Sequence, residues 1–230
     1  MKAVAVISGG LDSTTMAYLL RRDGYTLEAI SFNYGQRHIK ELQGAQRVAS
    51  ELGAPWTLID LEAAGIARCL AGSALTDPGV AVPDGHYADE SMRATVVPNR
   101  NAIMLTIASA LAASSGAEAV AFGAHAGDHP IYPDCRPEFV DQFQSMVSIA
   151  MQGVAEVRVL APFINMTKHE IVRLGYQLGV PFEETWSCYK GGDAHCGHCG
   201  ACVERCEAFE VTGIPDPTRY EMPSVAPLPR

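Results

Sequence analysis

The sequence predicts an α/β fold in which helices sandwich a parallel sheet. Short apolar runs of strand length alternate along the chain with longer segments whose apolar residues recur every three or four positions. Strands that alternate with helices in this way pair in parallel and are covered on both faces. Open parallel sheets bind ligands at the carboxyl ends of their strands, so the residues that follow each strand are the first candidates for a site.

Each predicted element has a local reason. The strands are the apolar runs at residues 3–7, 27–32, 56–59, 119–122 and 157–160. The helices are the periodic segments at residues 14–22, 39–52, 101–114, 138–151 and 169–178. Residues 63–98 are rich in Gly, Pro and Ala and have no sustained period, which predicts a long loop or a lid. The proline-rich segment from residue 214 is expected to cross the surface as an extended strap.

Composition and charge narrow the class of protein. The 230 residues suit one compact domain with a small appendage. Proteins that bind polynucleotides usually carry a basic surface, whereas this chain has a formal net charge of −9. We therefore expect small-molecule chemistry and no nucleic-acid partner. No segment has the ~18 apolar residues of a membrane span. No signal peptide is visible, so we expect a cytoplasmic protein without a membrane partner.

The segment Ser-Gly-Gly-Leu-Asp-Ser, from Ser8 to Ser13, joins the first predicted strand to the first predicted helix. It has neither the G-x-x-x-x-G-K-S/T pattern of a P-loop nor the G-x-G-x-x-G pattern of a dinucleotide-binding turn. Backbone N–H groups at the start of the helix and the hydroxyls of Ser8 and Ser13 predict a cradle for an anion. The alternative is an ordinary helix cap, because Asp and Ser are favoured capping residues and Gly-Gly is a common turn.

Five of the seven cysteines fall between residues 188 and 206, which indicates a metal site or catalysis more than a disulfide framework. The spacing C-x7-C-x2-C-x2-C places four thiols close together: Cys188, Cys196, Cys199 and Cys202. Four thiolates in a closed set predict one structural zinc ion per chain, with His195 and His198 outside the ligand set. The alternatives are an iron–sulfur cluster, which has the same ligand type, and a redox-active pair of Cys196 and Cys199.

The string from Ser8 to Ser13 resembles the SGGxDS signature of the pyrophosphate-loop ATP pyrophosphatases, which have the adenine nucleotide alpha hydrolase-like fold. The whole chain resembles one family of that class, the 7-cyano-7-deazaguanine synthases or QueC family. The stretches that carry this resemblance lie, in order, at residues 8–13, 34–42, 97–101, 132–139, 167–168 and 186–190. We expect the ATP pyrophosphatase domain at residues 1–184 and a small zinc-binding region at 185–230 packed on it.

The resemblance implies an ATP-dependent carbon–nitrogen ligase of queuosine biosynthesis that converts 7-carboxy-7-deazaguanine and ammonium to 7-cyano-7-deazaguanine. The carboxylate is adenylated, ammonia displaces AMP to give an amide, and a second activation dehydrates the amide to the nitrile. The resemblance also implies Mg²⁺ with ATP, a structural zinc ion and a homodimer. Two alternatives stay open, namely a related ligase that stops at the amide or uses another amine, and a nucleotide-binding module without turnover.

Site residues follow from the same resemblance. The residues expected to bind ATP are Ile7, Ser8, Gly9, Gly10, Leu11, Asp12, Ser13, Thr14 and Arg37. The candidate catalytic residues are Asp12, Arg100, Asp128 and Lys168, and the candidate substrate-binding residues are Asp128, Tyr132, Asp134 and Arg136. An aspartate can accept the N1–H and amine of a deazaguanine, an arginine fork suits its carboxylate, and cations neutralise the α-phosphate. Three histidines are candidates to take a proton from ammonium: His38, His125 and His129. The alternatives are turn residues and solvated surface charges.

Overall fold

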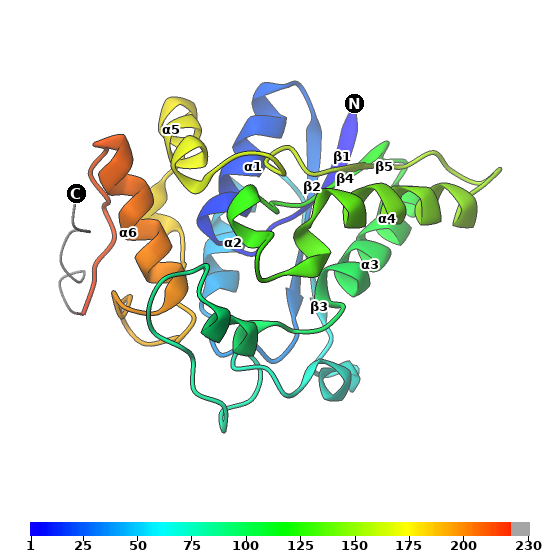
Figure 1. Cartoon of the computed structure of the whole chain (residues 1–230). Coiled ribbons are helices and arrows are strands. Elements are labelled where there is room, and N and C mark those ends of the chain that lie inside the picture. The colour runs from blue at the N-terminus through cyan, green and yellow to red at the C-terminus, as the bar shows by residue number, and fades with distance from the viewer. Residues whose placement is uncertain (222–230) are drawn as a thin grey trace.

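The structure is a computed structural model in which residues 1–221 are described (Figure 1). Its centre is a five-stranded parallel sheet in the order β3-β2-β1-β4-β5. The strands are β1 (Lys2–Val6), β2 (Thr26–Asn33), β3 (Trp56–Asp60), β4 (Ala119–Ala121) and β5 (Arg158–Leu160). The strand order reverses at β1, which pairs with β2 on one side and β4 on the other. The crevice at such a reversal, beyond the carboxyl ends of β1 and β4, is where ligands bind in this class of fold.

Helices connect and cover the strands. The α-helices are α1 (Leu11–Arg22), α2 (Glu41–Glu51), α3 (Arg100–Ser115), α4 (Pro137–Ala150), α5 (Lys168–Leu178) and α6 (Gly200–Thr212). Short 3-10 helices are η1 (Ile66–Leu70), η2 (Glu90–Thr95), η3 (Ala126–Asp128), η4 (Pro133–Cys135) and η5 (Phe182–Glu184). All the strands and helices predicted from the apolar periodicity are confirmed, with ends shifted by at most three residues.

Both faces of the sheet are buried. Ala3 and Ala5 of β1 belong to a buried cluster with residues of α1, α2, α5 and α6. Val4, which points to the opposite face, belongs to a second cluster with residues of α3 and α4. Successive side chains of a strand point to opposite faces, so a central strand of a sandwiched parallel sheet is an unbroken apolar run. Figure 1 shows α3 and α4 on one side of the sheet and α1, α5 and α6 on the other.

The region 63–98 is irregular apart from η1 and η2, as predicted. It forms a packed wall, because several of its apolar side chains are buried: Leu70, Leu75, Tyr87 and Met92. Its Gly85 N–H donates to the carbonyl oxygen of His198 at 3.0 Å, and Asp84 forms an isolated bridge with Cys199. The loop is therefore joined to the cysteine-rich segment.

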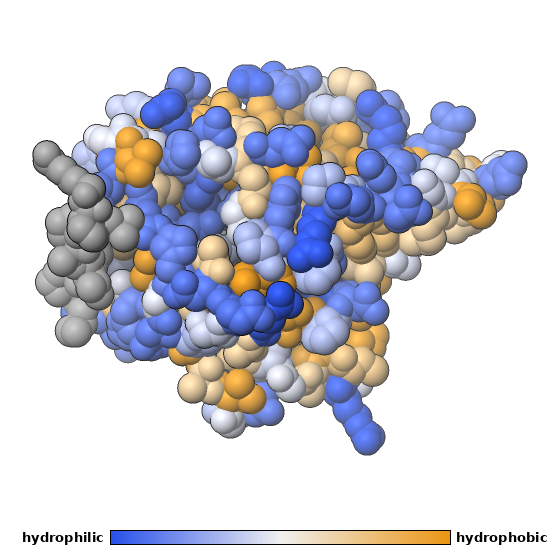
Figure 2. Space-filling model, viewed as in Figure 1, coloured by the Kyte–Doolittle hydropathy of each residue, from blue (hydrophilic) through white to orange (hydrophobic). Residues whose placement is uncertain are grey.

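The segment from residue 214 is held against α6. Arg205 of α6 is fully buried, and its guanidinium contacts the Asp216 carboxylate at 3.1 Å and the Thr185 hydroxyl at 2.7 Å. Residues 222–230 of the predicted strap lie outside the described residues. Among residues 1–221, no helix has both the length and the apolar character needed to cross a membrane. Most of the face in Figure 2 is polar, but apolar residues gather beside α4, where Ile149 and Val154 are exposed.

Candidate active site

The loop after β1 has a conformation that only glycine permits at one position. Gly9 has a φ of +91°, and a Cβ there would lie 1.9 Å from the backbone oxygen of Glu41. The hydroxyls of Ser8 and Ser13 lie 3.0 Å apart. The Ser8 N–H donates to the Ser13 hydroxyl at 3.1 Å, and the Gly10 N–H donates to the Ser8 hydroxyl at 3.2 Å. These bonds fix the shape of the loop against α2.

The N-terminus of α1 is open at this loop. Gly10 is the N-cap residue, and no side chain caps the helix. The first helical bond runs from the Thr14 N–H to the Gly10 carbonyl oxygen at 3.1 Å. The backbone N–H groups of residues 11–13 precede that bond, so they are the free donors of a helix N-terminus. An uncapped N-terminus that lines a pocket has the geometry of an anion site, and the alternative of an ordinary side-chain cap is contradicted.

A charged cluster lies beside this loop. The Lys168 ammonium contacts the Asp12 carboxylate at 2.6 Å and the Glu204 carboxylate at 3.3 Å. Thr167 and Glu170 form a capping box that starts α5, which places Lys168 at the first helical position. Burial lowers the pKa of Lys168, but the two carboxylates raise it above its usual value. The lysine therefore stays charged.

The carboxyl groups of the cluster respond differently to their surroundings. Burial tends to raise the pKa of Asp12, but Lys168 and His125 bring it below its usual value. Burial raises the pKa of Glu204 in spite of the nearby Lys168. Asp12 Oδ1 is buried and has no hydrogen-bond partner among the described residues. Asp12 is therefore an ionised carboxylate with one oxygen free for a ligand.

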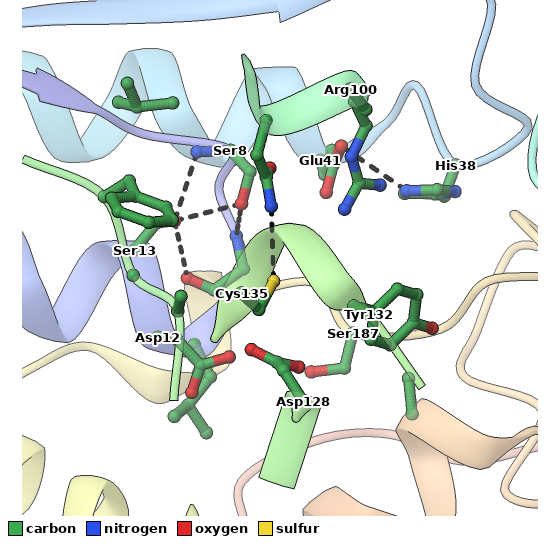
Figure 3. Close-up of a pocket in the computed structure, with 18 of the residues that line it drawn as sticks. Ser8, Asp12, Ser13, His38, Glu41, Arg100, Asp128, Tyr132, Cys135 and Ser187 are labelled. Carbon is green, nitrogen blue, oxygen red and sulfur yellow. Dashed lines mark hydrogen bonds and ion pairs between the residues drawn. The ribbon is translucent and has the colours of Figure 1, made fainter. Parts of the chain in front are cut away.

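Asp128 lies beside Asp12 in the pocket (Figure 3), and His125 Nε2 is within 3.9 Å of both carboxylates. It belongs to η3, where its Oδ2 accepts the His125 N–H at 3.0 Å. Its Oδ1 accepts the Tyr87 hydroxyl at 2.9 Å. Tyr189 lies 3.3 Å from the Tyr87 hydroxyl and 3.5 Å from the Tyr132 hydroxyl. Three tyrosines from separate segments thus form a hydrogen-bonding aromatic wall, and one of them, Tyr87, binds the Asp128 carboxylate.

A second polar group lies on another side of the same pocket, where Figure 3 shows Arg100, Glu41 and His38. Glu41 and His38 are only 7% and 4% exposed. Burial raises the pKa of Glu41 to about 8, although Gln36 and Arg100 act in the opposite direction. Burial also lowers the pKa of His38 to about 3, and Arg100 acts in the same direction. His38 is therefore neutral at physiological pH.

Most of the predicted site residues meet in one pocket. Those that line it are Ile7, Ser8, Gly10, Leu11, Asp12, Ser13, Arg100, Asp128, Tyr132 and Lys168. Gly9 and Thr14 lie behind its surface, and neither lines it. His38 also lines it, whereas His125 contacts Lys168 from behind and His129 is not part of the lining.

Three predicted residues are not brought to the pocket. The Arg37 guanidinium donates to the carbonyl oxygens of Asp77 and Val80, at 2.6 and 2.7 Å, and so braces the 63–98 wall. Asp134 accepts the Asn101 N–H at 3.0 Å at the start of α3. Arg136 donates to the carbonyl oxygen of His129 at 2.8 Å. Each of the three side chains therefore forms a hydrogen bond with a backbone group. For Asp134 and Arg136 this agrees with the alternative that they are turn residues.

Other pocket residues were not predicted. They come from α2, the 63–98 wall and the cysteine-rich region: Glu41, Tyr87, Ser187, Tyr189 and Glu204. Tyr189 lies in one of the stretches that carry the family resemblance, which was a usable signal. Glu204 lies two residues after a predicted metal ligand, and nothing in its local pattern separates it from a solvated helix residue. Its role follows from the packing of α6 on α5.

The four predicted metal-ligand cysteines form a compact cluster. The Sγ atoms of Cys188, Cys196, Cys199 and Cys202 all lie within 4.8 Å of one another, and all four residues are buried. Neither histidine belongs to the group, and His195 Nε2 instead accepts the Ser187 N–H at 3.0 Å. The donor set fits a single ion with soft ligands in tetrahedral geometry. Because Ser187, Tyr189 and Glu204 flank these cysteines, the cluster fixes one wall of the pocket.

Comparisons with known proteins show the family of this chain. The model of the family described as queuosine biosynthesis protein QueC matches residues 2–213. A 7-cyano-7-deazaguanine synthase of Rhizobium johnstonii is 58% identical over 96% of this chain and 92% of its own length. One from Paracoccus denitrificans is 56% identical over 96% of this chain and 94% of its own length.

Solved structures with a similar fold are more distant. The U34-tRNA thiolase NcsA from Methanococcus maripaludis, with its 4Fe-4S cluster, has a TM-score of 0.48 at 15% identity, and the match covers 93% of this chain and 65% of that chain. An NH3-dependent NAD synthetase from Campylobacter jejuni has a TM-score of 0.44 at 16% identity, covering 78% of this chain and 65% of that chain. The family assignment therefore rests on the sequence matches. This chain belongs to the QueC family.

Proposed function

We propose that this chain converts 7-carboxy-7-deazaguanine and ammonia, with ATP, to 7-cyano-7-deazaguanine in queuosine biosynthesis. The observation that carries the proposal is the match at 58% identity to a 7-cyano-7-deazaguanine synthase over 96% of the chain. The pocket supports it independently, because it joins an open helix N-terminus for phosphate to a charged lysine and an aromatic wall. A non-catalytic nucleotide module has no need of such a converging set of ionised groups.

The chemistry balances as two activations at the α-phosphate. The substrate carboxylate attacks the α-phosphorus, a carboxyl-AMP forms and pyrophosphate leaves. Ammonia then displaces AMP to give the amide and releases a proton. In the second cycle the amide oxygen attacks the α-phosphorus of another ATP and pyrophosphate leaves, and the resulting imidoyl-AMP loses AMP and both protons of the amide nitrogen to give the nitrile.

The residues divide this work by their charge and position. We assign the departing pyrophosphate to the backbone N–H groups at the start of α1, and the developing charge on the α-phosphate to Lys168. Arg100 is the second cation that lines the pocket. Asp12 orients Lys168, and its free Oδ1 suits the Mg²⁺ that arrives with ATP, because Mg²⁺ prefers oxygen ligands.

The purine-like substrate is assigned to the aromatic wall. Asp128 and Tyr132 are the two predicted substrate-binding residues that line the pocket. Tyr87 and the His125 N–H hold the Asp128 carboxylate in place, so its remaining lone pairs have a fixed direction toward a ligand. Preorganisation of this kind lowers the cost of binding.

We assign a structural zinc ion to the four cysteines. Its contribution here is to hold together the segment that carries Ser187 and Tyr189 and the start of α6, which carries Glu204. Zinc is preferred over an iron–sulfur cluster because Sγ atoms within 4.8 Å of one another are close enough to share one ion at Zn–S distances of about 2.3 Å.

We also propose a homodimer in the cytoplasm, as the family resemblance implies. The exposed apolar side chains of Met146, Ile149 and Val154 beside α4 support an association surface, because such patches are uncommon on monomers. Sedimentation analysis checks this, and a sedimenting mass of one chain would contradict it.

One reaction mixture tests the function. Purified protein is incubated with ATP, ammonium and 7-carboxy-7-deazaguanine, and products are identified by mass spectrometry. Nitrile together with AMP and pyrophosphate supports the proposal. Amide alone supports the ligase that stops halfway, and no nucleotide consumption supports the binding module. Release of ADP and phosphate contradicts attack at the α-phosphate.

A further inference from the structure

Glu41 and His38 form a buried polar group in the pocket wall that no step above uses. Both side chains line the pocket, on the side where Figure 3 shows Arg100, and away from Asp12 and Asp128. The His38 Nε2 and Glu41 Oε1 atoms lie 3.5 Å apart. Buried titratable groups in a pocket are costly for the fold, so they call for a ligand or a structural reason.

The structural reason is weak for Glu41. The turn after β2 is braced by Gln36, whose Oε1 accepts the Tyr34 N–H at 2.8 Å and whose amide donates to the Phe32 carbonyl oxygen at 3.0 Å. The bond from Gln36 to Glu41 Oε1 is long, at 3.3 Å, and adds little to that turn. The buried Glu41 carboxyl group needs stronger hydrogen bonds than this one to offset the cost of its desolvation.

His38 supplies an independent sign that a partner belongs here. Its side chain is 4% exposed, and its Nδ1 is buried without a hydrogen-bond partner among the described residues. Unpaired buried polar atoms are rare in native proteins and concentrate where a ligand or water completes the set.

The surrounding side chains define the shape and chemistry of that ligand. Phe32, Tyr34 and Met104 give apolar walls, and the Arg100 guanidinium lies 5.7 Å from the centre of the Tyr34 ring. An ammonium ion is disfavoured by the charge of Arg100, and a phosphate by the carboxyl of Glu41. A flat heterocycle with both hydrogen-bond donors and acceptors on one edge suits two carboxylate oxygens beside guanidinium N–H groups.

We infer that Glu41, together with Arg100, reads the amine-bearing edge of a purine ring, with the Glu41 carboxylate accepting from the exocyclic amine. Two ligands of the proposed function, on which this inference rests, carry such an edge: the adenine of ATP and the deazaguanine of the substrate. Asp128 already accepts two hydrogen bonds from the protein. The pocket therefore offers two carboxyl acceptors for the two rings, adenine and deazaguanine, and Asp128 is the one held more firmly by the protein. Glu41 is the freer one.

Equilibrium binding with paired ligands tests the inference without turnover. One pair is α,β-methylene ATP and its inosine counterpart, which lacks the amine. The other pair is 7-carboxy-7-deazaguanine and the analogue without its 2-amino group. Each dissociation constant is measured for the unchanged chain, for Glu41→Gln, and for Glu51→Gln, which alters an exposed glutamate on the same helix.

At about pH 9, above the pKa of about 8 to which burial raises Glu41, removal of the amine is expected to weaken binding to the unchanged chain by about tenfold or more for one of the two pairs, as for a hydrogen bond to a charged group. In Glu41→Gln the same removal should cost no more than about threefold, because the charge of the acceptor is gone. Glu51→Gln should match the unchanged chain. The pair that responds names the ring that Glu41 contacts.

The inference is overturned if, for both pairs, amine removal costs the unchanged chain and Glu41→Gln the same factor. Glutamine replaces the buried carboxyl group at nearly constant volume, so folding is not at risk, and thermal unfolding verifies this. Glu41→Leu repeats the cycle with no acceptor at all. Failure of the proposed function looks different, because it leaves binding measurable but yields no nitrile.

Discussion

Lys168→Met removes a cation that contacts two half-buried carboxylates, Asp12 at 2.6 Å and Glu204 at 3.3 Å. The Lys168 side chain is 13% exposed, so solvent screens these contacts little. Breaking a buried ion pair from one side costs about 3–5 kcal/mol of unfolding free energy, since the remaining charge stays buried. Loss of the same cation from the α-phosphate should lower the rate of AMP formation by about 10²–10³-fold.

The dependence on pH separates this mechanism from simple loss of packing. The pKa of Asp12 is depressed in the folded chain, so its pairing stabilises the fold above the unfolded carboxyl pKa and the benefit is lost as the pH falls through the folded pKa. The pKa of Lys168 is raised, so its benefit is present below about pH 10.5 and is lost only at higher pH. The difference in unfolding free energy between the unchanged chain and Lys168→Met should therefore be widest near pH 7 and should narrow below about pH 4.

Urea unfolding at about pH 7 and about pH 3, with pyrophosphate release at pH 7 as the activity assay, checks the prediction. The matched control is Lys40→Met, which removes an exposed pair with Asp193 of nearly the same length, 2.7 Å. Exposed pairs contribute about 0–1 kcal/mol, so the control should change little. A loss below about 1 kcal/mol for Lys168→Met, or an equal loss at both pH values, would refute the reasoning.

Three further predictions follow from the loop, the cysteines and the aromatic wall. Gly9→Ala should cost about 3 kcal/mol or more by thermal unfolding, because its Cβ overlaps a backbone oxygen at 1.9 Å, whereas Gly24→Ala, at a similar φ of +86° but in open space, should cost about 1–2 kcal/mol; equal losses would contradict the steric argument. Elemental analysis should find about one zinc per chain, and chelation should lower the unfolding temperature, while labile sulfide would contradict zinc. Asp128→Asn should raise the KM for the deazaguanine about tenfold and leave that for ATP nearly unchanged, because one oxygen that accepts hydrogen bonds is lost; an equal rise in both would contradict the assignment to the substrate.

Local chemistry made much of the molecule predictable. The apolar strands and periodic helices depend on contacts within a few residues, so their order and ends could be placed from the sequence within three residues. The loop at Ser8–Ser13 and the four cysteines are equally local, because each group is brought together by one short segment. The position of the first loop after β1 then placed it at the sheet edge where ligands bind.

Side-chain direction in the irregular segments was not predictable in the same way. Arg37, Asp134 and Arg136 have the right chemistry for ATP or substrate, but in this structure each pairs with a backbone group and none lines the pocket. Tyr87 and Glu204 reach the pocket from a loop without periodicity and from a helix of low amphipathic character, so neither carries a local signal. Which hydrogen-bond partner such a side chain finds depends on the path of the surrounding chain, and the local sequence does not fix that path.

The sequence by itself determined the order of the elements, the strand-to-helix loop at Ser8–Ser13, the cluster of four cysteines and, through its motifs, the family. Only the tertiary structure decided which charges meet: Asp12, Lys168 and Glu204 come from three helices far apart in the chain, and Glu41 and Arg100 from two others. The physical reason is that electrostatic and hydrogen-bond energies depend on distances of a few ångströms between segments. Those distances are set by how α5 and α6 pack and how the 63–98 wall is folded, and no local pattern records them.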